Sequence, residues 1–301
     1  MKVLVIGARG FIGAHLFRYF KDLKFEVLGC DTYFDIKNDA DQIRNVSVMS
    51  AEFSELVTSY KPNLCINAAG SGNVGLSLKE PMLDFESNVN LVAQLLDILR
   101  LNANSCKVLH ISSAAVYGNP KYLPINENTP CTPISPYGFH KWMSELLCKE
   151  FHSLYGLKIA IVRPFSVYGE GLRKQILWDL CNRCNVQKDI ILFGYGTETR
   201  DFIHISDLCK SIELIIRNSN FELDVYNLAN GISIEIKEVA DRISYRFPDS
   251  NILFNQQVKQ GDPLYWKSDI SKIKSLGYWG QVSLEKGING YIDWYLKTIN
   301  D

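Results

Sequence analysis

The stretch that decides the fold runs from Lys2 to Gly13 and reads KVLVIGARGFIG. Residues 2–6 form a short apolar run rich in β-formers, which is typical of a buried strand. Glycines follow at a spacing of three, and the chain then continues with helical character. In such a strand–turn–helix unit, Gly7 suits the tight turn, Gly10 lets backbone N–H groups approach a phosphate, and the last glycine permits close helix–strand packing. The unit therefore predicts a dinucleotide site at a helix N-terminus.

An acidic residue follows the second predicted strand and bears on the choice of dinucleotide. This strand, residues 25–30, ends at Asp31, 18 residues after Gly13. A carboxylate there accepts hydrogen bonds from ribose hydroxyls and repels the 2′-phosphate of NADP, so Asp31 favours NAD. Arg9 is the opposing signal, because a guanidinium beside the turn could hold that phosphate. We give Asp31 the greater weight and expect NAD rather than NADP.

Apolar strands alternate with helical stretches through the first half of the chain. Predicted strands cover 2–6, 25–30, 64–67, 107–112 and 159–164, and helical stretches fall near 84–102 and 138–154. This alternation predicts parallel strands joined by right-handed crossovers, which is an α/β fold with a doubly wound Rossmann sheet. Beyond residue 165 the pattern is irregular, with a helix over 172–186, a short strand over 190–193 and a turn over 194–199.

Candidate catalytic side chains lie at the end of the predicted strand 107–112 and around the start of the helical stretch near 138–154. Tyr137 and Lys141 are four residues apart in a predicted helix, so they share one face about one turn apart. A lysine ammonium beside a phenol favours the phenolate, which could then act as a base near neutral pH. Ser112 and Ser113 end a predicted strand at the carboxyl edge of the sheet, where open α/β folds bind ligands. A serine hydroxyl there could hydrogen-bond a sugar hydroxyl or carbonyl during hydride transfer.

With these motifs in order, the chain resembles an extended short-chain dehydrogenase/reductase of the nucleotide-sugar epimerase/dehydratase family, in particular enzymes like UDP-glucose 4-epimerase. The resemblance covers essentially the whole length. Its further motifs are Asn67-Ala68-Ala69, Val116-Tyr117-Gly118, Arg163-Pro164-Phe165, Arg200-Asp201-Phe202-Ile203-His204, Lys259-Gln260-Gly261-Asp262-Pro263, Leu276-Gly277 and Ile292-Asp293-Trp294.

The resemblance implies two domains and two sets of binding residues. A dinucleotide-binding Rossmann domain is expected over 1–165 and 202–231, and a smaller mixed α/β lobe for the nucleotide sugar over 166–201 and 232–301. The implied cofactor-binding residues are Gly7, Arg9, Gly10, Phe11, Ile12, Gly13, Asp31, Ala68, Ala69, Tyr137, Lys141 and Pro164. The implied substrate-binding residues are Ser113, Ser166, Arg200, Lys259 and Asp262.

The chemistry implied by the resemblance is reversible oxidation at a sugar carbon, usually the 4-position, with Ser113, Tyr137 and Lys141 as catalytic residues. Tyr137 as phenolate would take the hydroxyl proton while NAD accepts the hydride. Lys141 would lower the pKa of Tyr137 and bind the nicotinamide ribose, and Ser113 would hold the reacting oxygen. Ser113 is preferred to Ser112 because it lies four residues before Tyr117, as the family's Ser or Thr does.

Several positions depart from the family pattern. Dehydratases and decarboxylases of this family carry acidic residues directly after the catalytic hydroxyl, but here Ala114 and Ala115 follow, which disfavours dehydration and decarboxylation. Ser166 stands where many relatives have an Asn. Lys259 replaces the usual Arg, so diphosphate binding would lack the bidentate fork. Val48-Met49-Ser50 stands where an Asp usually meets adenine, which leaves adenine recognition open.

Three functions stay open at this point. A 4-epimerase with retained NAD fits Asp31 and the alanines. A 4-ketosugar reductase or 4-dehydrogenase with exchangeable NAD(P)(H) uses the same residues, and the short C-terminal half favours it. A non-catalytic dinucleotide-binding protein would usually have lost Tyr137 or Lys141, and both are present. We rank the epimerase first.

Composition excludes several other classes. The net charge is −1 at pH 7, so no basic field favours nucleic acid. There is no apolar run of membrane-spanning length and no leader-like segment, so we expect a soluble cytoplasmic protein. The eight cysteines lie scattered in apolar segments, as reduced buried thiols do. Cys181 and Cys184 form the one close pair, without the further ligands that zinc needs, so we expect no metal site.

Two predicted helices have enough apolar surface for a homodimer, which is common in the family as a four-helix bundle. They cover 88–101 and 138–152. Their apolar residues are Leu91, Leu95, Leu96, Leu99, Trp142, Leu146 and Leu147. Burial within one chain would explain many of the same residues.

Overall fold

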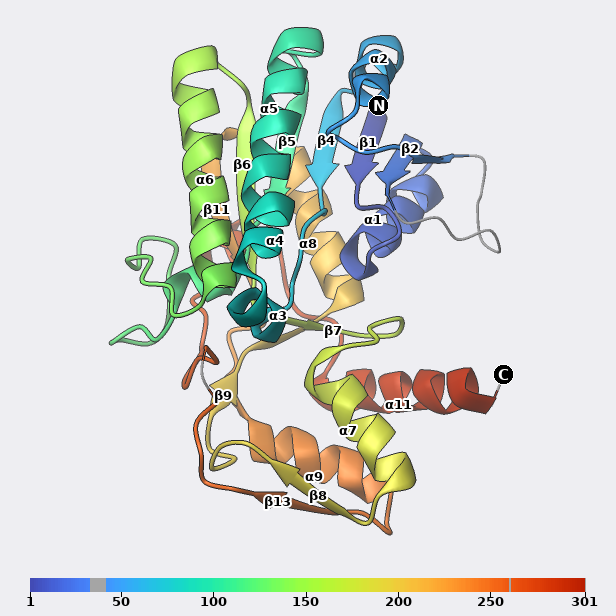
Figure 1. Ribbon diagram of the computed structural model, residues 1–301, viewed down its shortest axis with the longest axis vertical. Coiled ribbons are helices and arrows are strands. Elements are labelled where there is room, and N and C mark those ends of the chain that lie inside the picture. Colours follow the sequence, from blue (N-terminus) through green and yellow to red (C-terminus); the bar gives the residue numbers. More distant parts are fainter. Residues whose placement is uncertain (33–41, 260, 301) are drawn as a thin grey trace. The chain divides into compact units, whose positions relative to one another are not determined.

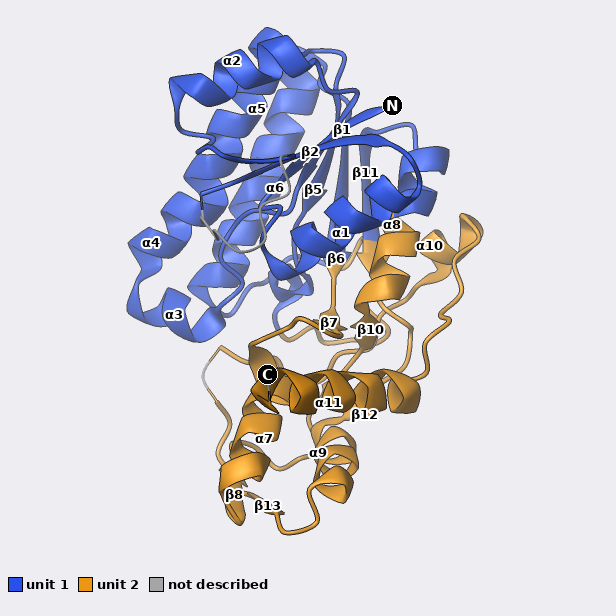
Figure 2. Cartoon of the chain, turned by 90° about the vertical axis from the view of Figure 1, so that its right-hand side faces the viewer, with its two compact units in different colours: residues 1–118, 130–163, 213–226 blue, residues 119–129, 164–212, 227–301 orange. Residues whose placement is uncertain are grey.

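The computed structural model describes residues 1–32, 42–259 and 261–300, which form two compact units (Figure 2). Unit 1 comprises Met1–Gly118, Pro130–Arg163 and Glu213–Tyr226. Unit 2 comprises Asn119–Thr129, Pro164–Ile212 and Asn227–Asp301.

Unit 1 is built on a seven-stranded sheet in the order β11-β6-β5-β4-β1-β2-β3 (Figure 1). The neighbours from β3 through β6 all pair in parallel, which confirms the predicted α/β fold with a doubly wound Rossmann sheet. The strands are β1 Lys2–Ile6, β2 Glu26–Asp31, β3 Ile43–Asn45, β4 Leu64–Asn67, β5 Lys107–Ile111, β6 Ile159–Pro164 and β11 Glu222–Leu228. The five predicted strands are confirmed to within one residue at either end, whereas β3 and β11 were not predicted.

Helices cover both faces of this sheet. Figures 1 and 2 show α2, α5 and α6 on one face, and α1 and α8 on the other. The helical segments are α1 Phe11–Asp22, α2 Ala51–Tyr60, α3 Val74–Lys79, α4 Pro81–Phe85, a π-helical turn Glu86–Asn90, α5 Leu91–Asn102, a 3₁₀ turn Ala114–Tyr117, α6 Pro136–Tyr155 and α8 Ile205–Asn218, the last beginning in unit 2. A core cluster packs the sheet against α2, α5 and α6 through residues such as Leu4, Cys65, Phe53, Leu95 and Cys148.

The topology places loops from distant sequence side by side. The chain runs from β1 outward to β2 and β3, and then returns to β4 on the other side of β1. Parallel pairing sets Ile6 opposite Asn67, so the loops that start at Gly7 and Ala68 leave the sheet as neighbours. This reversal of strand order is where doubly wound sheets bind ligands.

Two capped helices position side chains beyond this edge. Ser135 caps α6 by accepting a hydrogen bond from the Gly138 N–H at 3.2 Å, and Pro136 occupies the first turn, as helix starts favour. Tyr137 therefore lies in the first turn of α6. The helix predicted near 84–102 is interrupted by the π-helical turn Glu86–Asn90, a local widening often found at functional sites.

Unit 2 is a smaller mixed α/β unit. Its strands form three two-stranded sheets, of which β10-β7 and β13-β8 are parallel and β12-β9 is antiparallel. The strands are β7 Ser166–Tyr168, β8 Asp189–Leu192, β9 Thr199–Arg200, β10 Phe202–His204, β12 Ile234–Glu235 and β13 Asn251–Phe254. The helices are α7 Gln175–Val186, α9 Ile236–Arg246, α10 Ser271–Ser275 and α11 Leu284–Asn300. The predicted helix over 172–186 thus begins three residues later.

All eight cysteines are free thiols, and all except the half-buried Cys131 are buried, as predicted. Within the described ranges, no helix is both long enough and apolar enough to cross a bilayer. The same ranges contain no cluster of three or more His, Cys, Asp or Glu side chains that could hold a metal ion.

Candidate active site

The glycine-rich turn of unit 1 forms one wall of a cleft of about 540 Å³. Gly7 has φ +77°, and a Cβ there would lie 2.8 Å from the Ala69 backbone, so this position demands glycine. A Cβ on Gly13 would lie 2.0 Å from the Gly7 carbonyl oxygen, so α1 can approach the turn only without a side chain. The cleft is lined by Gly7, Arg9, Gly10, Asp31, Thr32, Ala68, Ala69, Gly70, Ser71, Leu76, Leu83, Asp84, Ser87 and Leu91.

This cleft fits the dinucleotide that the sequence predicts. The bare backbone at the start of α1 leaves room for a phosphate, and the helix end offers it a partial positive charge. Asp31, at the end of β2, lines the same cleft, and its Oδ2 accepts a hydrogen bond from the Arg9 N–H at 2.8 Å. Phe11 and Ile12, in the first turn of α1, are half-buried and do not line the cleft.

The three predicted catalytic residues come together at the carboxyl edge of unit 1. Ser113 follows β5, is half-buried, and hydrogen-bonds to Tyr137. The Ser113 hydroxyl also accepts the Ala115 N–H at 3.1 Å, which fixes it at the start of the 3₁₀ turn. Lys141 follows Tyr137 by one turn of α6 and is 5% exposed. The arrangement brings one hydroxyl, one phenol and one ammonium to the same edge.

Burial dominates the protonation of the phenol. It raises the pKa of Tyr137 to about 12, and the Asp84 carboxylate acts in the same direction, while the Ser113 hydrogen bond opposes both. Lys141 Nζ donates to the Ile111 carbonyl at 3.1 Å. Burial and Asp84 thus act against the lowering of the pKa of Tyr137 that the sequence analysis expected from Lys141.

A buried polar network lies behind Ser113 and separates its role from that of its neighbour. Ser112 points into unit 1, where its hydroxyl donates to Glu145 Oε1 at 2.5 Å. Arg163 binds the same carboxylate through two hydrogen bonds of 3.0 and 2.6 Å and donates to the Tyr117 hydroxyl at 2.8 Å. The Ser112 hydroxyl thus belongs to the buried Glu145–Arg163 network, and Ser113 is the serine that contacts the Tyr137 phenol.

The remaining predicted cofactor residues line the same edge or lie close to it. Ala68 and Ala69 follow β4, and Asn67 Oδ1 accepts the Ala69 N–H at 3.2 Å. Pro164 is the buried last residue of β6. Asn88 Oδ1 and Lys141 Nζ both border Gly70, 2.5 and 3.4 Å from the place a Cβ would take, so a side chain at Gly70 would displace them.

The predicted substrate residues other than Ser113 belong to unit 2. Arg200 is half-buried, its guanidinium lies 5.8 Å from the centre of the Trp266 ring, and its Nη1 donates to the Thr199 carbonyl at 2.9 Å. Burial lowers the pKa of Arg200, whereas the carboxylates of Asp262 and Glu198 act in the opposite direction. The Asp262 carboxylate is thus close enough to influence Arg200.

Ser166 and Lys259 complete the predicted substrate set. Ser166, the first residue of β7, is half-buried, and its N–H donates to the Asp201 carbonyl at 3.0 Å. Lys259 is exposed, and its carbonyl accepts the Asp262 N–H at 3.2 Å. Gln260, between them in the predicted motif, lies outside the described residues.

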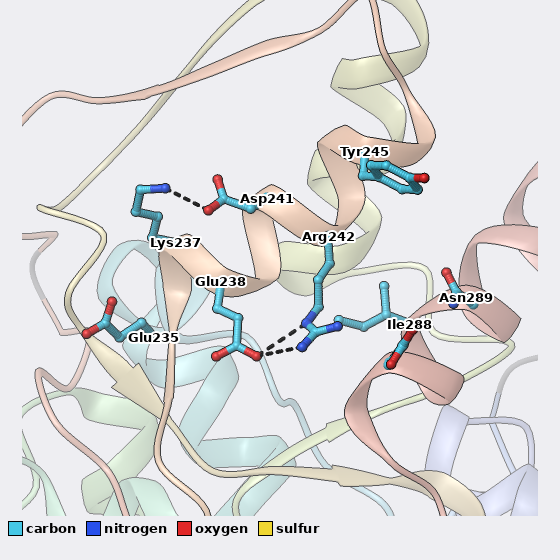
Figure 3. A pocket seen from close by; sticks show the side chains of 9 residues that line it. Glu235, Lys237, Glu238, Asp241, Arg242, Tyr245, Ile288 and Asn289 are labelled. Atoms are coloured by element: carbon cyan, nitrogen blue, oxygen red, sulfur yellow. Dashed lines mark hydrogen bonds and ion pairs between the residues drawn. The ribbon is translucent and has the colours of Figure 1, made fainter.

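A second cleft lies within unit 2, between α9 and α11 (Figure 3). Its charged side chains pair with one another along α9: Lys237 with Asp241 at 2.6 Å, and Glu238 with Arg242 at 2.9 Å. No residue that the sequence analysis selected lines it. The clustered candidate residues of unit 1 therefore carry the argument for function.

Sequence reasoning missed several polar residues of unit 1. Asp84 and His140 form a buried pair at 2.7 Å across 56 residues of sequence, and nothing local announces such a contact. Arg163 did carry a signal, because a charge inside an otherwise apolar strand implies a buried partner, which proves to be Glu145.

Comparison with known proteins agrees with this geometry. The model of the NAD dependent epimerase/dehydratase family matches residues 3–229. The chain is 28% identical to UDP-glucuronate 4-epimerase of Thermodesulfobacterium geofontis over 98% of its own length and 96% of the relative. It is 30% identical to UDP-glucose 4-epimerase of Lactobacillus helveticus over 81% and 82% of the two lengths.

A solved structure adds a spatial match. UDP-glucuronic acid 4-epimerase from Bacillus cereus, in complex with UDP-glucuronic acid and NAD, superposes with a TM-score of 0.90 at 26% identity and covers 99% of this chain and 100% of that one. The predicted family and its cofactor, NAD, are thereby confirmed. The chain belongs to the NAD dependent epimerase/dehydratase family and is an NAD-dependent enzyme of that family.

Proposed function

We propose that the chain is a nucleotide-sugar 4-epimerase that inverts the sugar through a transient 4-keto intermediate. The observation that carries this proposal is the Ser113–Tyr137 hydrogen bond, with Lys141 one turn along α6 at the same sheet edge. Ala114 and Ala115, which follow Ser113, cannot act as acids or bases, which favours epimerisation over dehydration. Two relatives named above are 4-epimerases of UDP sugars.

The residues of unit 1 divide the chemistry between them. Bound NAD supplies hydride transfer to and from the sugar carbon. Tyr137 takes the proton of the 4-hydroxyl and later returns it, and Ser113 holds the reacting oxygen in place. Lys141 binds the nicotinamide ribose and stabilises negative charge on Tyr137. Gly7, Gly10 and Gly13 allow the pyrophosphate to approach α1, Asp31 accepts from the adenosine ribose, and the neighbouring Arg9, Phe11, Ile12, Ala68, Ala69 and Pro164 complete the cofactor site.

The proposal gives unit 2 the recognition of the nucleotide sugar. Arg200 and Lys259 bind the diphosphate, Asp262 the ribose, and Ser166 the sugar. The relatives support uridine diphosphate as the carrier and glucose or glucuronic acid as the sugar. We retain as a proposal the predicted domain limits, 1–165 and 202–231 for NAD and 166–201 and 232–301 for the nucleotide sugar. The compact units divide the chain differently, because residues 119–129, 164–165, 202–212 and 227–231 belong to unit 2.

We further propose that the protein is a homodimer, and we retain the prediction of a cytoplasmic location. Of the seven apolar residues predicted for the dimer, Leu95, Leu96 and Leu99 are buried in the core of unit 1, and the partly buried Leu91 and Leu147 pack against that core. Phe139, Met143 and Leu146, which recur one turn apart on α6, are instead 44%, 40% and 49% exposed. This exposed stripe supports the pairing of α6 with a second copy.

The proposal is tested by adding UDP-glucose and UDP-glucuronic acid to the purified protein without further cofactor and following the sugars by NMR. A product of unchanged mass, inverted at carbon 4, is expected. Conversion that starts only when NAD(P) or NAD(P)H is added, with stoichiometric consumption of that cofactor, would instead assign a 4-dehydrogenase or 4-ketosugar reductase.

A further inference from the structure

A buried acid–histidine pair lies beside Tyr137 and has no role in the chemistry assigned so far. Asp84, in α4, is 2% exposed, and its Oδ2 lies 2.7 Å from Nδ1 of His140. His140 follows Tyr137 by three residues on α6, so the two side chains share a face of the helix. The Phe85 ring packs edge-on against the imidazole at 5.5 Å. These contacts hold the pair next to the proposed acid/base.

Only one of the two carboxylate oxygens of Asp84, Oδ2, is paired with His140. Its Oδ1 is buried and accepts no hydrogen bond from any residue in the described ranges. A buried charge is poorly screened, so its field reaches neighbouring groups more strongly than that of a surface charge. Asp84 accordingly acts on Tyr137, where its negative charge disfavours the phenolate and adds to the effect of burial.

Other charged and titratable groups packed around this end of α6 are accounted for. His110, from β5, is buried near Lys141, and burial together with that ammonium lowers its pKa to about 3, so it is neutral at neutral pH. Glu145, two turns along α6 from Tyr137, is paired with Arg163 at 2.6 Å. The carboxylates of Glu80 and Glu86, at the two ends of α4, belong to exposed residues. Among the described carboxylates, Asp84 is the one whose charge acts on Tyr137.

We propose that Asp84, held in place by His140, is a positioning residue that sets how readily Tyr137 gives up its proton. A group that first accepts and then returns a proton works best when neither form is too stable. The Ser113 hydrogen bond favours the phenolate and the Asp84 charge opposes it, so these two neighbours act on the Tyr137 phenol in opposite directions. The effect on turnover rests on the proposed function, whereas the effect on Tyr137 ionisation rests on unit 1 alone.

The test measures that ionisation without any substrate. The full chain is labelled with ¹³C at the tyrosine ring carbon bearing the hydroxyl, the Tyr137 signal is assigned with Tyr137→Phe, and its chemical shift is followed against pH. Asp84→Asn removes the charge and keeps the shape. Glu86→Gln is the matched control, because it removes an exposed carboxylate two residues away. Asp84→Ser is the second variant if the amide does not fold.

We expect the Tyr137 midpoint to fall by about one pH unit in Asp84→Asn and to stay unchanged in Glu86→Gln. The limb of the kcat profile that reports Tyr137 should move to lower pH by the same amount. A folded Asp84→Asn or Asp84→Ser protein with an unmoved Tyr137 midpoint overturns the proposal, whatever its activity. If no nucleotide sugar is converted at all, the NMR titration still decides this proposal, and the proposed function alone fails.

Discussion

At the scale of single residues, opposing influences converge on one phenol. Burial and Asp84 raise the pKa of Tyr137, and the hydrogen bond from Ser113 lowers it. A base with a raised pKa is scarce in its active form at neutral pH, so activity limited by Tyr137 should rise as pH rises toward that pKa. Any change that strengthens or removes one of these influences should shift this pH dependence of the activity, in a direction that the structure determines.

Removing the Ser113 hydroxyl should shift the part of the pH–activity profile that reports Tyr137 to higher pH. In Ser113→Ala the phenolate loses its hydrogen bond, so the pKa of Tyr137 rises further and sugar conversion at neutral pH falls by roughly 10²-fold. The lost contact to the Ala115 N–H should also cost about 1 kcal/mol of folding free energy. Conversion rates and denaturant unfolding measure the two effects.

Ser113→Thr separates chemistry from folding, because it keeps a hydroxyl in the same place. It should retain most of the activity and the upward shift should not appear. Full activity in Ser113→Ala would show that the hydroxyl does not serve the reaction.

At the scale of elements, α6 performs two tasks with two faces. Its Ser135 cap and Pro136 fix where the helix starts and hence where Tyr137 lies, and the Tyr137 N–H donates to Ser77 Oγ at 3.2 Å. One face thus serves the site and the core. The opposite stripe of Phe139, Met143 and Leu146 is exposed, and apolar stripes of this kind pair helices between subunits.

A charge in that stripe should disrupt pairing. Met143→Glu would bury an unpaired carboxylate at the proposed interface, so light scattering during size-exclusion chromatography should show half the mass of the parent protein. Met49→Glu is the matched control, because Met49 is 51% exposed and lies just before α2, away from the stripe. A parent protein that is monomeric at all concentrations, or a Met143→Glu protein of unchanged mass, would contradict the dimer.

At the scale of the whole molecule, the elements that could be predicted from the sequence are those marked by a contiguous run of residues. Strands long enough to be apolar runs, such as β1 and β4, and the loops at their ends were predicted because each signal is contiguous. The three-residue strand β3 has one half-buried and two exposed residues and leaves no such run. β11 lies beyond residue 165, where the predicted alternation breaks down.

The catalytic candidates could be predicted from the sequence, whereas the side chains packed around them could not. Tyr137 and Lys141 lie one turn apart in one helix, so spacing alone places them together. Asp84 meets His140 only through the packing of α4 on α6, and no periodicity encodes a contact over 56 residues. The effects of burial and of Asp84 on the pKa of Tyr137 could not be predicted from the sequence for the same reason, since both are tertiary effects.

The central claim, that Tyr137 moves the proton in an epimerisation of nucleotide sugars, is tested most directly by Tyr137→Phe beside Tyr155→Phe. Both variants remove one phenolic hydroxyl from α6, and Tyr155 stands at its far end. We predict that interconversion of the UDP sugar falls by about 10³-fold in Tyr137→Phe and is unchanged in Tyr155→Phe, with equal thermal unfolding of both. A folded Tyr137→Phe protein that converts the sugar within about tenfold of the parent rate would contradict the account.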